Sequence, residues 1–120
     1  MILNRAAVLT MVSLVGCAGI PSATDISEEI SRGMNYEEIF VMLSDYEMGR
    51  DFRGDVTALQ YCSGSNKNTE YVIVWFIGDQ VEGVTQYYKD IPRNERCGWF
   101  FTEVDWAQAP TVVKTKLFIE

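Results

Sequence analysis

One segment constrains the fold of this 120-residue chain more than any other: residues 70–77, Glu-Tyr-Val-Ile-Val-Trp-Phe-Ile. Its β-branched and aromatic residues occupy both alternating faces, which predicts a central strand with one face on the helices and the other partly covered or available for contacts. Gly78-Asp79 follows and favours a tight hairpin into a second strand over 81–88. Residues 56–62, Val-Thr-Ala-Leu-Gln-Tyr-Cys, predict a strand before this hairpin.

Two short helices are predicted ahead of these strands. Asp25 with Glu28 forms a capping-box pair for a helix over 26–32, and Asn35 is the expected N-cap of a second helix over 36–44. In the second helix an apolar stripe recurs at helical spacing. The order predicts an α+β fold in which two short N-terminal helices pack on an antiparallel β-meander sheet in two layers.

The C-terminal part adds an extra strand region to this prediction. Residues 99–106, Trp-Phe-Phe-Thr-Glu-Val-Asp-Trp, are one strand candidate, and residues 111–119 after Pro110 are another. The chain has no repeat, low-complexity tract or internal linker, so residues 26–120 are expected to form a single domain.

The N-terminus carries the features of an export signal. Arg5 is followed by an apolar stretch over residues 6–16, which is too short to span a bilayer core, since that needs ~20 helical residues. Leu14-Val15-Gly16-Cys17 resembles a bacterial lipobox. The resemblance implies a signal peptide over 1–16, cleavage between Gly16 and Cys17, and lipidation of the Cys17 sulfur, with residues 17–25 as a lipid-anchored tether.

Residue 18 bears on the destination of such a lipoprotein. It is Ala18 and not Asp, which under the usual sorting rule implies the inner leaflet of the bacterial outer membrane, facing the periplasm. Two alternatives to the lipobox remain open: an ordinary signal peptide, or a first buried segment in which Cys17 is incidental.

Two further cysteines are available for a disulfide. Export places Cys62 and Cys97 in an oxidising compartment, and with Cys17 committed to lipid a Cys62–Cys97 bond is the simple pairing. A redox pair and a metal site are the alternatives. The spacing is not Cys-x-x-Cys, and two thiols without His make a poor zinc site.

Composition disfavours several classes of function. The chain has no His, which removes Ser-His-Asp and Cys-His catalysis, and its net charge of −7 disfavours nucleic acid. The acidic residues over 45–55 lack the ligand spacing of a calcium loop. Arg50 and Arg53 are expected in a solvated loop with local ion pairs, or less simply in a small anion site. We expect no catalytic residue, no cofactor and no metal.

The C-terminal half is rich in aromatic residues. Because helices can cover only one sheet face, Tyr87, Trp99, Phe101 and Trp106 form a candidate interaction surface on the other face. The alternative is a second small core under the loop at 89–98, held by Cys97.

The lipobox, residues 30–39 (Ile-Ser-Arg-Gly-Met-Asn-Tyr-Glu-Glu-Ile) and the strand-turn-strand over 72–81 together resemble the SmpA/OmlA, or BamE-like, outer-membrane lipoproteins. That resemblance implies two helices on a three-stranded antiparallel sheet. Residues 44–46 depart from the family, which has Gly-x-Pro there. The tail at 89–120 lies outside its pattern and resembles small envelope lipoproteins, some of them phage-associated.

These features together set the functional expectation. We expect a non-enzymatic, lipid-anchored module that binds an envelope protein as an accessory in outer-membrane assembly or maintenance. The alternative is a small inhibitor or exclusion protein, possible for a phage gene, that blocks an envelope enzyme or receptor. The expected partners are the membrane, through the N-terminal lipid, and an envelope protein.

Overall fold

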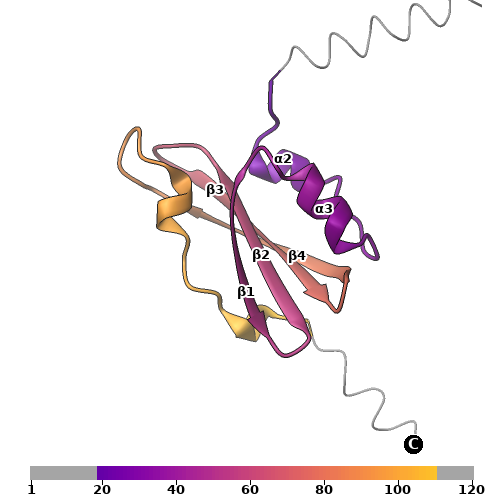
Figure 1. Ribbon diagram of the computed structural model, residues 1–120. Helices are drawn as coiled ribbons and strands as arrows, with labels where there is room; N and C mark the ends of the chain where they lie inside the picture. Colours follow the sequence, from indigo (N-terminus) through magenta and orange to yellow (C-terminus); the bar gives the residue numbers. More distant parts are fainter. Residues whose placement is uncertain (1–18, 111–120) are drawn as a thin grey trace, which may run out of the picture.

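The computed structural model describes residues 19–110, and its centre is an antiparallel sheet with strand order β1-β2-β3-β4 (Figure 1). Two short helices precede the sheet, so the predicted α+β class holds. The helices are α2 (Ala23–Ser27) and α3 (Tyr36–Met42), and the strands are β1 (Glu47–Arg53), β2 (Val56–Ser63), β3 (Thr69–Ile77) and β4 (Gln80–Lys89).

Strand β3 occupies the interior position that its apolar run predicts. Residues 71–76 are all buried, and β3 pairs with β2 on one side and β4 on the other. Gly78-Asp79 forms the tight turn into β4, with Gly78 at φ 59°, a conformation that glycine adopts without steric cost. The predicted hairpin is therefore confirmed.

Strand β1 corrects an expectation. The sequence predicts a loop at Arg50 and Arg53, whereas both lie on β1, which pairs with β2 in register from Glu47↔Cys62 to Arg53↔Val56. The strand carries few apolar residues because it lies at the edge of the sheet. Charged side chains are common on such strands, since they discourage pairing with other chains.

The second helix begins as predicted. The Asn35 side chain accepts from the Glu38 backbone N–H and the Glu38 side chain accepts from the Asn35 backbone N–H, which completes the capping box. The first helix begins earlier than predicted. Its N-cap is Ser22 and not Asp25, so residues 23–25, assigned to the tether, belong to α2.

The main core lies between the two helices and one face of the sheet. From the sheet it takes the alternating side chains that face the helices, and from α2 and α3 it takes the residues that face the sheet. Its members are Ala23, Ile39, Leu43, Leu59, Tyr61, Val72, Val74, Phe76 and Val81. The apolar stripe predicted for the second helix is confirmed at Ile39 and Leu43, but Phe40 is 41% exposed.

The opposite face of the sheet is covered by the chain that follows β4. We call residues 97–109 the cover segment. It contains two 3-10 helices, Cys97–Phe100 and Trp106–Gln108, so the predicted strand over 99–106 is wrong. The disulfide from Cys97 to β2 holds this segment over the face of the sheet, where its backbone has no strand edge to pair with. The strand predicted over 111–119 lies outside the described residues.

No helix within residues 19–110 is long and apolar enough to cross a lipid bilayer.

Candidate protein-binding surface

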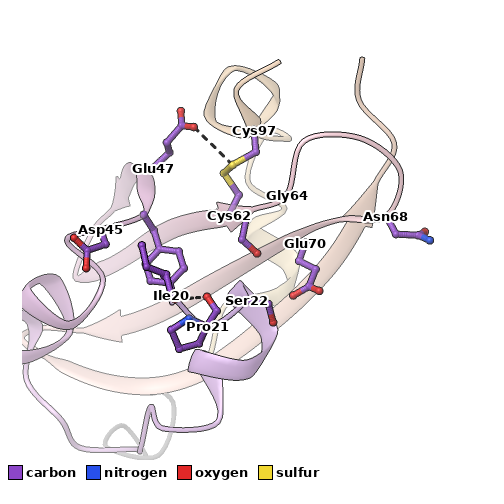
Figure 2. A pocket seen from close by; sticks show the side chains of 12 residues that line it. Ile20, Pro21, Ser22, Asp45, Glu47, Cys62, Gly64, Asn68, Glu70 and Cys97 are labelled. Atoms are coloured by element: carbon purple, nitrogen blue, oxygen red, sulfur yellow. Dashed lines mark hydrogen bonds between the residues drawn. A yellow bond between two sulfur atoms is a disulfide. The ribbon is translucent and has the colours of Figure 1, made fainter. Parts of the chain in front are cut away.

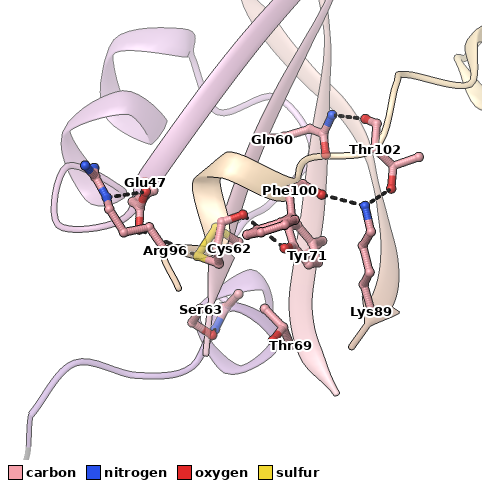
Figure 3. The surroundings of a disulfide bond; sticks show 12 residues. Glu47, Gln60, Cys62, Ser63, Thr69, Tyr71, Lys89, Arg96, Phe100 and Thr102 are labelled. Carbon is pink, nitrogen blue, oxygen red and sulfur yellow. Dashed lines mark hydrogen bonds and ion pairs between the residues drawn. A yellow bond between two sulfur atoms is a disulfide. The ribbon is translucent and has the colours of Figure 1, made fainter. Parts of the chain in front are cut away.

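A disulfide joins Cys62 of β2 to Cys97 at the start of the cover segment (Figure 3). This is the pairing that the sequence predicts. Both cysteines are buried, with Ile91 and Tyr71 in the same cluster. The Tyr71 hydroxyl donates to the Cys97 carbonyl oxygen at 3.0 Å. Burial raises the pKa of Tyr71 to about 12, so this donor keeps its proton at neutral pH.

Polar side chains fasten the middle of the cover segment to the sheet. The Gln60 amide donates to the Thr102 carbonyl at 2.9 Å and accepts from the Tyr87 hydroxyl at 2.7 Å. The same hydroxyl accepts from the Thr102 backbone N–H at 2.9 Å. Lys89 donates to the Phe100 carbonyl at 2.7 Å (Figure 3). The cover segment is thus held by both the disulfide and a satisfied hydrogen-bond network.

Most residues of the predicted aromatic surface pack against other rings of the same chain. Tyr87 stacks on the buried Tyr71 ring at 4.8 Å, and Phe101 meets the same ring edge-on at 5.8 Å. Trp106 meets Trp75 edge-on at 5.8 Å. These three predicted surface residues are half-buried in contacts within the chain, which is the alternative of a second small core. Of the four, only Trp99 is exposed, at 67%.

A different surface carries exposed apolar side chains close together. Phe40 and Val41 of α3 are 41% and 68% exposed, and Phe52 of β1 is 62% exposed. Tyr36 and Arg50 lie between these elements. Phe40, Tyr36, Arg50 and Phe52 form a row of contacts that we call the α3–β1 patch. Single exposed apolar side chains are common on protein surfaces, whereas a contiguous group of them marks an interaction site.

Arg50 organises the α3–β1 patch. Its guanidinium donates to the Tyr36 hydroxyl at 2.8 Å and lies 5.7 Å from the Tyr36 ring centroid and 5.0 Å from that of Phe52. Tyr36 in turn stacks on Phe40 at 5.9 Å. Among residues 19–110, Arg50 forms no ion pair. Aromatic residues and arginine are the types enriched at the energetic centres of protein interfaces.

A shallow groove of about 350 Å³ runs through the patch. Its walls come from α3 and β1, and Leu59 of β2 lies between them. The lining is mostly apolar, with the Arg50 guanidinium as its cationic group. Such a groove can take apolar side chains of a protein partner and one acceptor, such as a carboxylate, for Arg50.

A larger, more polar hollow of about 530 Å³ lies beside the disulfide (Figure 2). Two of its carboxylates already have partners: Glu47 pairs with Arg96 at 3.2 Å, and Glu70 accepts from the Thr24 backbone N–H at 2.9 Å. Partial burial alone would raise the pKa of Glu70, but the hydrogen bonds outweigh it and the pKa lies below its usual range. Glu47 thus ties the residue that precedes the cover segment to β1, and Glu70 ties the start of α2 to β3.

Within residues 19–110 no cluster of His, Cys, Asp or Glu could hold a metal ion. Gly16 and Cys17, the predicted cleavage and lipidation site, lie outside the described residues. The chain that follows them is tied to the sheet. The Tyr46 hydroxyl donates to the Pro21 carbonyl at 2.6 Å, and the Ala23 N–H donates to Ser63 Oγ at 2.8 Å.

Comparisons of the chain with protein-family models, with curated proteins and with solved structures give no match.

Proposed function

We propose that this protein is a non-enzymatic, lipid-anchored module of the bacterial cell envelope that binds another envelope protein through the α3–β1 patch. The observation that carries the proposal is that the exposed Phe40 and Phe52 lie on either side of the Tyr36–Arg50 pair. The lipobox resemblance at Cys17 and the similarity to SmpA/OmlA lipoproteins supply the location and the role as an accessory in outer-membrane assembly or maintenance.

The position of the N-terminus suits an anchored domain. Five residues separate Cys17 from Ala23, the first residue of α2, and can span at most about 20 Å. Ala23 is held at the end of β2 by Ser63. A lipid on Cys17 would therefore keep this end of the sheet near the membrane and leave the hairpin turns at Gly54 and Gly78 on the far side.

This orientation favours a protein over the bilayer as the ligand of the α3–β1 patch. Phe52 lies one residue before the far end of β1, and the Tyr36 backbone N–H donates to the Asp79 carbonyl, in the far turn. The patch thus lies toward the end of the domain that points away from the anchor. A partner in the periplasm can reach it without displacing lipid.

The experiment that tests the proposal compares three variants expressed in a bacterial host that has an outer membrane. Phe40→Ser with Phe52→Ser removes exposed apolar area from the patch. Tyr88→Ser is the matched control, because Tyr88 is a 58% exposed aromatic on β4. Trp99→Ser tests the remaining exposed member of the aromatic surface predicted from sequence. Each protein is crosslinked in intact cells, purified from membranes and compared with Cys17→Ser.

We expect an envelope protein to be crosslinked at least ten-fold less by the double variant than by wild type, and equally by the two single variants. Loss of crosslinking in Trp99→Ser alone would move the binding site to the cover segment. If no envelope protein is recovered above the Cys17→Ser background, the proposed function is wrong.

A further inference from the structure

We propose that the anchored end of the domain rests in the lipid headgroup region of the membrane, through a surface of exposed aromatic, apolar and basic side chains. The inference rests on the proposed function for the lipid anchor and adds a second contact with the same bilayer. We call Ile20, Lys67, Tyr88, Arg93 and Trp99 the anchor-side face. All five residues are exposed.

Ile20 and Trp99 lie at the same end of the molecule and are 63% and 67% exposed. Ile20 lines the hollow beside the disulfide, and so does Cys97, two residues before Trp99 (Figure 2). The 3-10 helix that carries Trp99 also packs against the start of β1, because a Cβ on Gly98 would meet the side chain of Glu47. The hollow therefore separates the two exposed side chains by no more than its own width and the turn of this short helix.

Tyr88 lies at this end on the helix side of the sheet. It pairs with Glu70 in the β3–β4 ladder, and Glu70 accepts from the Thr24 backbone N–H in the first turn of α2. Directly paired residues share a face, so Tyr88 lies on the side of the sheet where α2 begins, three residues after Ile20. Tryptophan and tyrosine are the side chains enriched at the membrane–water interface, because each joins an apolar ring to a polar group.

Two loops complete this end of the domain and are joined to each other. The Ile91 N–H donates to the Asn66 carbonyl at 2.9 Å, and the Asn94 N–H donates to the Ser65 carbonyl at 3.0 Å. The loop after β2 and the loop after β4 thus form one continuous surface.

The charge of these loops differs from that of the whole chain. Residues 64–68 and 89–99 contain four basic and two acidic side chains, whereas the chain has a net charge of −7. Lys67 and Arg93 are exposed, and within residues 19–110 neither forms an ion pair. Anionic lipid headgroups attract Lys and Arg side chains close to the membrane surface. The acidic remainder of the domain is repelled by the same headgroups, so the charges favour this end toward the bilayer.

The anchor decides between a bilayer and a protein as the occupant of this face. Ile20 is three residues from Cys17, a distance of at most about 11 Å along an extended chain. A lipid on Cys17 therefore places Ile20 close to the headgroups before any partner binds. Single exposed apolar side chains are ordinary. Here three of them share the anchored end with two basic loops, while the α3–β1 patch lies toward the other end and stays accessible.

Fluorescence quenching by brominated lipid tests the inference on the full lipoprotein. The protein is purified from host membranes in detergent and reconstituted into vesicles of phosphatidylethanolamine and phosphatidylglycerol, with bromine near the headgroup end of the acyl chains. Trp99→Phe removes the tryptophan of the anchor-side face. Trp106→Phe is the matched control, because Trp106 packs against the buried Trp75 toward the other end of the cover segment.

We expect wild type and Trp106→Phe to be quenched at least about two-fold more strongly than Trp99→Phe. Equal quenching of wild type and Trp99→Phe, in a protein whose intact mass includes the lipid, would overturn this inference alone. A chain without lipid would overturn the proposed anchor as well. Loss of the crosslinked envelope protein in Trp99→Ser would assign the face to a protein and would also overturn the inference.

A second pair of variants tests the basic loops in the same vesicles at low ionic strength, where surface charges are least screened. Lys67→Gln with Arg93→Gln removes two positive charges from the anchor-side face, and Arg32→Gln with Arg53→Gln removes two from elsewhere on the domain. We expect the quenching of Trp99 to fall at least about two-fold in the first pair only. An equal result in the two pairs would overturn the inference, since the loops would then make no contact of their own.

Discussion

Replacing both bridging cysteines, Cys62→Ser with Cys97→Ser, should destabilise the domain by roughly 4 kcal/mol. The two residues are 35 positions apart. In the chain-entropy treatment, the bond removes from the unfolded chain a loop-closure entropy worth roughly 4 kcal/mol at 25 °C for a loop of this length. Small domains are stable by only about 5–15 kcal/mol, so this is a large share.

The domain should still fold without the bond. The main core lies on the other face of the sheet, and the contacts of Gln60 and Tyr87 with Thr102 do not involve either cysteine. We therefore expect a folded variant whose cover segment opens more readily than the sheet. Exchange of the amides in the cover segment should accelerate more than exchange in β3.

Urea unfolding followed by circular dichroism measures the change. The wild-type protein under reducing conditions is the control and should unfold at the same urea concentration as the double variant. The free energy of unfolding should also depend more steeply on urea concentration, because the unfolded chain without the bond exposes more surface. A loss of under 1 kcal/mol would refute the view that the disulfide is a major source of stability.

Two further predictions concern tyrosines that make contacts inside the chain, Tyr87 and Tyr61. Tyr87→Phe should cost about 1–3 kcal/mol in the free energy of unfolding measured in urea, because the Gln60 side-chain oxygen and the Thr102 N–H each lose a partner; a neutral change would mean that water replaces the hydroxyl. Burial of the Tyr61 side chain, and then the neighbouring Tyr46, raises the pKa of Tyr61 above 10. The contribution of the Tyr61 hydroxyl to the free energy of unfolding should therefore be complete below pH 10 and decline as the pH rises further. The decline of stability should be smaller in Tyr61→Phe, and an equal decline in both proteins would contradict this account.

The parts of the fold that could be predicted are those with strong local signals. The apolar run at 70–77 and the turn at Gly78-Asp79 predict the β3–β4 hairpin, and Asn35 with Glu38 predicts the start of α3. In each of these elements, the residues that give the local sequence signal also make the contacts that stabilise the element. The disulfide was predictable because the lipobox resemblance assigns Cys17 to lipid and leaves two other cysteines, Cys62 and Cys97.

Strand β1 was not predicted because its residues are typical of the edge of a sheet and not of its core. Glu47–Arg53 contains charged residues at most positions, and such a segment also suits a loop. One signal was available. Gly54-Asp55 repeats the dipeptide of the predicted hairpin at Gly78-Asp79, and Gly54 has a similar φ of 61°. Read as a turn, it would have placed a strand before Val56.

The strand predicted over 99–106 failed for a tertiary reason. Its aromatic residues have high strand propensity, but Cys97 is bonded to Cys62 of β2, so the segment lies across the face of the sheet. The rings of Phe101 and Trp106 therefore pack against rings of β3. Propensity alone does not distinguish these two uses of an aromatic residue. The same fact explains why Tyr87, Phe101 and Trp106 are covered, whereas Trp99 is exposed.

The α3–β1 patch was missed because it depends on contacts between distant residues. Tyr36 and Phe40 look like members of a buried helical stripe, and Arg50 and Phe52 look like loop residues. Only the pairing of β1 with β2 brings Arg50 within hydrogen-bonding distance of Tyr36. Helical periodicity identifies the residues on the apolar face of α3, but it does not show which of them the sheet covers. Ile39 and Leu43 are buried there, whereas Phe40 remains 41% exposed.

The most direct test of the central claim, that this is an exported and lipid-anchored protein with one internal disulfide, is the intact mass of the protein extracted from membranes, with and without reductant. The account predicts the mass of residues 17–120 plus diacylglycerol and acyl chains, with two thiols that appear only after reduction. A Cys17→Ser variant should lack the lipid mass. A full-length chain without lipid and with three free thiols would contradict the account.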